Sequence, residues 1–184
     1  LAGGGRGACP VGCGGGAMTD GVAPPAQARV FCCASTACLS SNSEAVRKEF
    51  ELLLGRGAGV EVRQSGCMGL CSRGPMVRIE RPDGSDALFE SVTPELAPRI
   101  IETLTEQAAP LEQLLDQQVP FFARQVRIVT AHSGRIDPEA IEDYLAVGGY
   151  EALNTAVSSM RPQDVVAEIT QSGLRGRGGA GFPT

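Results

Sequence analysis

The sequence predicts an α/β fold, because short runs of strand-forming residues alternate with amphipathic runs at helical spacing. The alternation is clearest over residues 28–109, where four short strands and two helices are expected. Apolar residues make up 42% of the 184-residue chain, which is ordinary for a protein with a packed core. Residues 1–25 are rich in Gly, Ala and Pro without apolar periodicity, and they are expected to form a disordered tail.

The first half of residues 28–109 predicts a strand, a helix and a second strand. Residues 28–32 form the first strand and lead into a loop with cysteines. A helix is expected to begin within Ser41–Glu44, which has the spacing of a capping box, and to end at Gly55 and Gly57. Residues 60–63 alternate like a strand. The apolar positions of the helix are Val46, Phe50, Leu53 and Leu54.

The second half predicts a hairpin and a helix. Residues 76–80 and 87–90 flank the turn signal Pro82-Asp83-Gly84, which is typical of two paired strands. A helix is expected from Thr93-Pro94-Glu95, and Pro98 should delay its regular part by about one turn, because proline lacks the N–H that the helix uses. Its apolar face is formed by Leu96, Ile100, Ile101 and Leu104. Strand, helix, strand, hairpin and helix in this order give a compact domain of thioredoxin-like outline.

The remaining chain is expected to be a linker at 110–125, with a short helix around 111–117, followed by the start of a second domain at 126–184. The elements predicted in that domain are a strand at 126–130, a helix from Asp137-Pro138-Glu139 to Gly148-Gly149, a helix at about 150–158, and a helix from Pro162 to Gly173. These elements cannot bury their apolar faces alone. The chain is therefore expected to be a C-terminally truncated fragment.

Four cysteines form two close pairs, and both pairs follow predicted strands. Cys33 and Cys38 have the spacing C-x4-C, and Cys67 and Cys71 have the spacing C-x3-C. A [2Fe–2S] cluster requires four thiolates, two for each iron, and one sheet could bring the two loops together at one edge. The glycines and small residues in these loops let the backbone approach, and its amides can donate hydrogen bonds to sulfur. The quartet therefore predicts a [2Fe–2S] cluster.

Two alternatives for this quartet remain. A structural four-cysteine zinc site in a non-catalytic α/β scaffold is one, although zinc pairs are most often spaced C-x2-C. A redox dithiol is the other, although the expected C-x-x-C is absent. Cys32 competes with Cys33 for the first ligand position, and Cys33 is preferred because it gives the C-x4-C spacing and ends the strand. Cys32 is then expected to be a small buried hydrophobe.

Composition limits the compartment and the partners. The net charge of −5 argues against nucleic acid as a partner, and no apolar run approaches the roughly 20 residues of a membrane helix. Seven cysteines without a signal peptide favour a reducing, cytoplasmic compartment, with any membrane association made through partner subunits. Cys9 and Cys13 are expected to be unligated, since two ligands in a flexible tail bind a metal poorly.

The chain ends in a glycine-rich stretch directly after a predicted helix. Residues 176–181 contain four glycines, and Arg175 and Arg177 add positive charge suited to phosphate. Such a loop offers backbone N–H groups and room for a flat or phosphorylated ligand. A flexible linker is an equally fair interpretation of glycine alone, and the spacing is not that of a P-loop.

Together these features resemble a known family. Cys33, Cys38 and Gly66-Cys67-Met68-Gly69-Leu70-Cys71 are similar to the ligand pattern of thioredoxin-like [2Fe–2S] ferredoxin domains. The later chain resembles the NADH-binding flavoprotein subunit of respiratory complex I and its soluble relatives in formate dehydrogenases and hydrogenases. The matching stretches are 134–139, 148–153 and 172–184.

The resemblance implies a ferredoxin domain followed by the start of an α/β FMN-binding domain. It places FMN and NAD(H) at Gly176, Arg177, Gly178, Gly179, Ala180, Gly181 and Phe182. A [4Fe–4S] cluster is expected in the missing C-terminal part. The implied activity is NADH:acceptor oxidoreduction, with hydride exchange at the flavin and electron transfer to or from an iron–sulfur partner subunit. No residue of this fragment is expected to act as a catalytic acid or base.

Overall fold

The computed structural model describes residues 27–55, 59–104 and 111–184, so the predictions for the tail, Cys9, Cys13 and Gly57 lie outside the described residues. The first region contains β1 (Ala28–Cys33), α1 (Thr36–Ser40), α2 (Ser43–Leu54), β2 (Val60–Ser65), η1 (Cys71–Arg73), β3 (Val77–Glu80), β4 (Asp86–Phe89), η2 (Pro94–Leu96) and α3 (Ala97–Glu102). The later region contains α4 (Pro120–Ala123), α5 (Ile141–Ala146), α6 (Glu151–Ser159) and α7 (Pro162–Ser172). The α/β fold class is confirmed.

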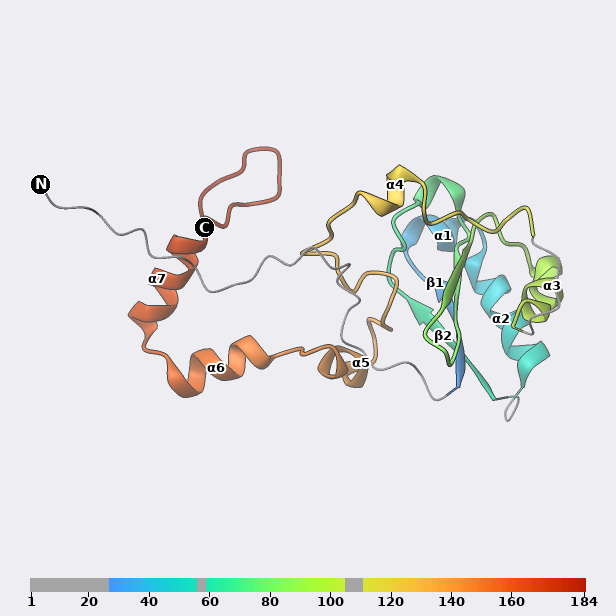
Figure 1. Cartoon of the computed structure of the whole chain (residues 1–184), viewed down its shortest axis with the longest axis horizontal. Coiled ribbons are helices and arrows are strands. Elements are labelled where there is room, and N and C mark those ends of the chain that lie inside the picture. The colour runs from blue at the N-terminus through green and yellow to red at the C-terminus, as the bar shows by residue number, and fades with distance from the viewer. Residues whose placement is uncertain (1–26, 56–58, 105–110) are drawn as a thin grey trace, which may run out of the picture.

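The four strands form one mixed sheet in the order β2-β1-β3-β4 (Figure 1). The central strand β1 pairs in parallel with β2 and antiparallel with β3, and β3 pairs antiparallel with β4. In the parallel pair Cys33 lies opposite Ser65, so both strands end at the same edge of the sheet. All four strands predicted over this region are therefore confirmed, and their ends place both cysteine loops at one edge.

The two faces of the sheet are covered differently. On the helix-side face, α2 and α3 pack their apolar residues on alternate residues of β1, β3 and β4. This core contains Val30, Cys32, Val46, Phe50, Leu54, Val77, Ile79, Ala87, Phe89, Val92, Ala97, Ile100 and Leu111. The loop-side face holds a smaller cluster of Phe31, Cys33, Cys38, Met68, Met76 and Leu88. Because successive strand residues point to opposite faces, Cys32 and Cys33 belong to different clusters.

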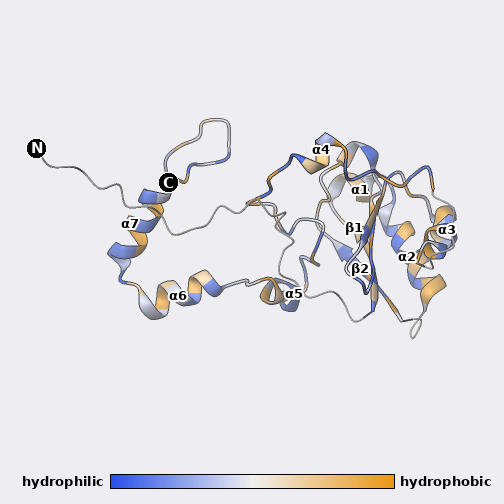
Figure 2. Ribbon diagram, viewed as in Figure 1, coloured by the Kyte–Doolittle hydropathy of each residue, from blue (hydrophilic) through white to orange (hydrophobic). Residues whose placement is uncertain are grey.

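The region after the sheet extends away from it as an arm that carries α5, α6 and α7 (Figure 1). Hydrophobic and hydrophilic residues alternate around α6 and α7 (Figure 2). Neither helix contains a buried residue, and Val157 and Val166 are 75% and 66% exposed. None of the helices in the described residues is long and apolar enough to cross a membrane.

Several local predictions hold and others are wrong. The delayed helix after Thr93 is confirmed, since η2 precedes α3. The predicted capping box does not form, because Ser41 is the residue that ends α1. The residue that caps α2 is Asn42, which has a left-handed conformation and makes no side-chain hydrogen bond to the helix. The structure also contains α1, a helix inside the first cysteine loop that sequence analysis did not predict.

The predicted helix at 111–117 is also wrong. The chain there runs along β4: Leu114 bridges Phe89, the Glu90 amide donates to the Gln113 carbonyl at 2.9 Å, and the Leu115 amide donates to the Leu88 carbonyl at 2.8 Å. Pairing with an edge strand satisfies these backbone groups in place of a helix.

The later elements are predicted in part. No strand forms at 126–130, where Val126, Ile128 and Val129 are 84%, 79% and 77% exposed and lack a neighbouring strand. The helix expected from Asp137 begins only at Ile141, after a turn. The helices α6 and α7 agree with the predictions, and Gly173 ends α7 with a φ of 65°.

Two leucines of α2 provide a matched test of where the core lies. Leu54 is 9% exposed in the helix-side core, whereas Leu52 is 77% exposed. Leu54→Ala leaves a cavity and should lower the free energy of unfolding by about 2–4 kcal/mol. Leu52→Ala should change it by less than about 0.5 kcal/mol. Urea unfolding followed by circular dichroism measures both, and equal losses would contradict this placement of the core.

Candidate metal centre

Two cysteine loops meet where β1 and β2 end. Cys33 is the last residue of β1, and its amide donates to the Met76 carbonyl at 3.0 Å. The next amide, of Ala34, donates to the Ser65 carbonyl at 2.9 Å and holds the first loop against the end of β2. The second loop, which contains Cys67 and Cys71, starts directly after Ser65. The parallel pairing of the two strands therefore brings both cysteine pairs to one place.

The four predicted ligands are arranged as two neighbouring pairs. The Sγ atoms of Cys67 and Cys71 are 3.3 Å apart. Cys33 and Cys38 are buried in the same loop-side cluster, and Cys33 contributes to raising the pKa of both Cys38 and Cys71. Among the described residues, no group of three or more His, Cys, Asp or Glu side chains is placed to hold a metal ion. The fold brings the four thiols to one edge of the sheet, two from each loop.

Glycines shape the space around these thiols. A Cβ atom on Gly74 would lie 2.8 Å from Cys38 Sγ, so only glycine allows the backbone to pass this sulfur without displacing it. Gly69 has a φ of +94°, which L side chains rarely adopt, and its amide points at Cys67 Sγ from 3.3 Å. A cluster with anionic sulfur favours such close backbone donors. The residues present therefore fit an iron–sulfur cluster.

Three thiols of this site differ in how readily they lose a proton. Burial opposes ionisation of Cys67, but hydrogen bonds from the Gly69 amide, Cys71 and Ser35, together with the charge of Arg127, outweigh it and lower the pKa of Cys67. The hydrogen bond with Cys67 holds the proton of Cys71 and raises the pKa of Cys71, and repulsion by a negative charge on Cys67, whose sulfur is 3.3 Å away, acts in the same direction. Burial raises the pKa of Cys38 to about 11. Of these three thiols, Cys67 is thus the first to form a thiolate.

Cys32 lies outside the site although it neighbours Cys33 in sequence. Its side chain is 2% exposed in the helix-side core, on the face opposite to the other thiols. Burial raises the pKa of Cys32 to about 12, so this group remains a neutral thiol near neutral pH. The expectation that Cys32 is a small buried hydrophobe is confirmed.

The segment after α4 packs on the second cysteine loop; residues 126–143 are called the connector below. Gly134 has a φ of +75°, and a Cβ there would lie 2.9 Å from Met68 Cγ and 3.0 Å from Met68 Cα. Its carbonyl accepts a hydrogen bond of 3.1 Å from Nη1 of Arg78, whose side chain is 7% exposed. The connector therefore approaches the loop more closely than any side chain at position 134 would allow.

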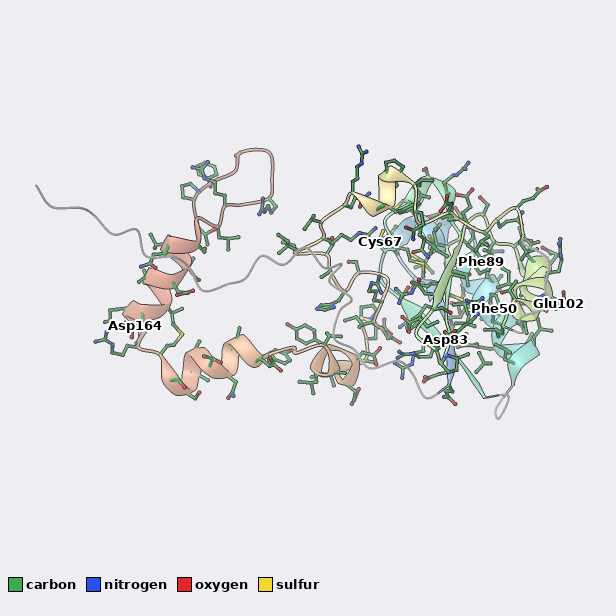
Figure 3. The ribbon with its side chains drawn as sticks, viewed as in Figure 1. Phe50, Cys67, Asp83, Phe89, Glu102 and Asp164 are labelled. Carbon is green, nitrogen blue, oxygen red and sulfur yellow. The ribbon has the colours of Figure 1, made fainter. Side chains whose placement is uncertain are left out.

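Two further contacts hold the connector against β2. Nη1 of Arg63 lies 2.5 Å from Oδ1 of Asp143, and Gln64 donates to Oδ1 of Asp137 at 3.3 Å. Asp143 also accepts the Asp137 amide at 2.9 Å, which closes the turn before α5. Burial opposes the charge of Asp143, but Arg63 and the Asp137 amide keep the pKa of this carboxyl below its usual value. Figure 3 places Cys67 on the side of the domain from which the connector leaves, opposite Glu102 of α3.

The predicted nucleotide-binding residues lie together in one loop at the far end of the arm (Figure 1). The Gly176 amide donates to the Phe182 carbonyl at 2.8 Å, and the Thr184 amide donates to the Leu174 carbonyl at 3.2 Å. These bonds close a loop whose tip, residues 177–181, is mostly exposed, and Phe182 itself is 75% exposed. Adding a Cβ to Gly178 or Gly179 meets nothing within 4 Å, so the loop tip is open.

Sequence reasoning missed three residues that shape the cysteine site. Arg78 and Arg127 reach it from β3 and from the connector, which the sequence does not reveal without the fold. Gly134 could have been noticed from the sequence, because it is the first residue of one of the stretches that resemble the flavoprotein family.

The fold is that of a small α/β domain with two pairs of thiols at one edge of its sheet. Residues 21–105 match the family model of the thioredoxin-like [2Fe-2S] ferredoxin. The chain therefore contains a thioredoxin-like [2Fe–2S] ferredoxin domain, as the sequence motifs predicted.

Two relatives illustrate the similarity of the chain to longer proteins. It is 57% identical over 61 residues to the HndC subunit of the NADP-reducing hydrogenase of Solidesulfovibrio fructosivorans, covering 33% of this chain and 12% of that protein. It is 51% identical over 45 residues to a subunit of the NADH-quinone oxidoreductase of Aquifex aeolicus, covering 24% of this chain and 10% of that protein. The chain thus matches only a small part of each of these relatives.

Two solved structures match the chain at low similarity. The thioredoxin-like [2Fe-2S] ferredoxin from Aquifex aeolicus superimposes with a TM-score of 0.41 and 21% identity, over 50% of this chain and 99% of that one. An NAD+-reducing [NiFe]-hydrogenase in the air-oxidized state gives a TM-score of 0.40 and 20% identity, over 87% of this chain and 27% of that one.

Alkylation of the protein after removal of bound metal should follow the order of the pKa values. Cys67 should react with iodoacetamide before Cys71, at a rate that rises with pH and reaches half its maximum below the usual cysteine pKa. Cys32, with a pKa of about 12, has only about one thiolate in ten thousand at pH 8 and should stay unlabelled until the chain unfolds. Peptide mass mapping measures each site, and early labelling of Cys32 would contradict its burial.

Proposed function

We propose that the chain is an electron-transfer part of an NADH-linked oxidoreductase, in which Cys33, Cys38, Cys67 and Cys71 hold a [2Fe–2S] cluster. The observation that carries the proposal is the meeting of two thiol pairs at the ends of two adjacent parallel strands. This cluster requires two thiolates for each iron, and each pair of cysteines can provide the two ligands of one iron.

Three features favour a two-iron cluster over one zinc ion. The pairs are spaced C-x4-C and C-x3-C, whereas the cysteine pairs of structural zinc sites are most often spaced C-x2-C. Gly74 and Gly69 provide space beside sulfur and an amide donor to sulfur, respectively. The relatives are subunits of oxidoreductases by name. A cluster bound here would exchange one electron at a time and leave bond making to other cofactors.

The side chains of the site have distinct tasks in this proposal. The lowered pKa of Cys67 means that it would bind iron more readily than Cys38 or Cys71, and bound metal then favours loss of the remaining protons. Cys33 and Cys38, both 1% exposed, anchor the buried side of the cluster, while Cys71 lies on the exposed side. Electrons would reach and leave the cluster most readily on that exposed side.

We further propose that Gly176, Arg177, Gly178, Gly179, Ala180, Gly181 and Phe182 line an FMN and NAD(H) site. Support comes from the open, glycine-rich loop at the end of α7 and from the NADH-quinone oxidoreductase subunits among the relatives. FMN, when bound, exchanges a hydride with NAD(H) and single electrons with iron–sulfur clusters. The loop amides and Arg177 would bind and orient phosphate and ring, and Phe182 would contact the nucleotide.

The complete enzyme in this proposal has further parts. The relatives are far longer than their matched segments, which leaves room for the remaining flavin contacts and a [4Fe–4S] cluster. Electrons would pass to or from an iron–sulfur subunit of a multi-subunit complex. The protein would be cytoplasmic, with any membrane association made through that complex.

Neighbouring cysteines of β1 provide the sharpest test of the ligand set. Cys33→Ser should abolish the visible absorption of the cluster, whereas Cys32→Ser should retain it, because the two side chains lie on opposite faces of the sheet. Cys67→Ser should behave like Cys33→Ser. Visible spectra are measured together with iron, acid-labile sulfide and zinc content.

The control separates ligand loss from unfolding. All three variants should keep the far-UV circular dichroism of the unsubstituted chain. Retention of the cluster in Cys33→Ser with its loss in Cys32→Ser would overturn the ligand set. A colourless protein with stoichiometric zinc would replace the proposal with the zinc scaffold.

A flavin site at the loop can be tested in the protein expressed from its complete gene. Gly179→Val fills space that the backbone amides need for a ligand, and it should reduce FMN content at least about tenfold without changing the absorption of the [2Fe–2S] cluster. Ser159→Ala, at the exposed end of α6, is the matched control and should retain FMN. Unchanged FMN and NADH oxidation in Gly179→Val would exclude this loop from the site.

A further inference from the structure

The connector brings a guanidinium group to the second cysteine loop. Nη2 of Arg127 lies 3.2 Å, and its Cζ 3.8 Å, from the position that a Cβ of Gly69 would occupy. The Gly69 amide is the group that donates to Cys67 Sγ at 3.3 Å. Arg127 therefore covers the stretch of backbone that contacts the sulfur, and the absence of a side chain at Gly69 lets it approach.

Arg127 and Arg73, which both lie beside this loop, differ in their acidic neighbours. Within the described part of the chain, no carboxylate forms an ion pair with Arg127. Arg73, which follows Cys71, is different: its Nη2 lies 2.9 Å from Oε1 of Glu90, and its Nε donates to Oε2 at 2.9 Å. Among the described residues, Arg127 thus contributes a positive charge beside the cysteine pair that no carboxylate cancels.

Gly134 holds this part of the connector in place. Its carbonyl accepts a hydrogen bond from the buried Arg78, and its backbone packs on Met68 and on the Cys67 carbonyl. A Cβ at this position would lie 3.0 Å from Met68 Cα, which is backbone and cannot swing aside. The position of Arg127 therefore depends on glycine seven residues later in the chain.

We propose that Arg127 raises the reduction potential of the [2Fe–2S] cluster. We also propose that the packing of Gly134 on Met68 holds Arg127 in place beside the cluster. This proposal rests on the proposed cluster ligands. Reduction adds one negative charge to the cluster, and a nearby cation stabilises that charged form more than the oxidised form. Because Arg127 is exposed, water and salt screen part of the effect.

The test is an EPR-monitored redox titration of the 184-residue chain with its cluster assembled. Arg127→Gln should lower the equilibrium constant for one-electron reduction about three- to tenfold, which at about 59 mV per tenfold corresponds to a midpoint about 28–59 mV lower. Arg127→Lys should keep most of the potential, since it keeps the charge. The difference between Arg127→Gln and the unsubstituted chain should shrink at high ionic strength.

Two further variants make the test specific. Arg99→Gln removes the same charge from α3, on the opposite side of the domain from Cys67, and should leave the potential unchanged. Gly134→Ala should lower the potential in the same direction as Arg127→Gln by displacing the connector. In the double variant the two shifts should not add, because both act through the position of one guanidinium.

The outcomes separate this proposal from the proposed function. A normal [2Fe–2S] spectrum with the same potential in Arg127→Gln and the unsubstituted chain would overturn the role of Arg127 alone. Equal shifts in Arg127→Gln and Arg99→Gln would do the same, because they would reflect net charge and not position. An unsubstituted chain that assembles no [2Fe–2S] cluster would overturn the proposed function and this proposal with it.

Discussion

The parallel pairing of β1 with β2 is the constraint on which the cysteine site depends. Parallel strands run in the same direction and end at the same edge, so the residues that follow them meet although they are far apart in sequence. Here Cys33 lies opposite Ser65, and the loop with Cys67 and Cys71 begins immediately afterwards. The helix α2 is the crossover that makes this pairing possible. A change in register by one residue would move Cys33 to the other face and separate the two pairs.

The connector extends this arrangement beyond the sheet domain. Arg78 is buried on the loop-side face, where its guanidinium lies 5.7 Å from the ring centroid of Phe31 and donates to the Gly134 carbonyl. Asp143 binds Arg63 at the edge strand β2. A buried arginine is expensive unless its donors are satisfied, so the backbone of the connector completes the burial of Arg78 while it covers the cysteine loop. The connector therefore packs on the sheet domain at the same place where it covers the cysteine loop.

The sequence predicts those elements whose burial pattern is local. Val46 and Phe50 recur at helical spacing because α2 lies on the sheet, and the strand β1 is apolar throughout most of its length because both its faces are covered. Elements that depend on partners far away in the sequence cannot be predicted from a local burial pattern. Residues 126–130 have strand composition but no neighbouring strand, and Leu114 pairs with Phe89, 25 positions earlier, which no helical pattern reveals. For the site, the spacing of the cysteines predicts Cys33 as a ligand, but the place of Arg127 beside the cysteine loop is visible only in the folded chain.

The two faces of the sheet have different roles: the helix-side face contributes most of the packing, and the loop-side face carries proposed cluster ligands. The helix-side core is larger than the loop-side cluster and consists of hydrophobic residues. Cys32 belongs to it as a small apolar side chain. Two of the six residues in the loop-side cluster are proposed ligands, and its backbone passes close to sulfur at Gly74 and Gly69. A glycine such as Gly69 leaves no side chain to pack, so the stability of this face depends on packing elsewhere in the domain. Because β1 and β3 belong to both faces, the helix-side core can hold the ends of the strands rigid while the other face adapts to a cofactor.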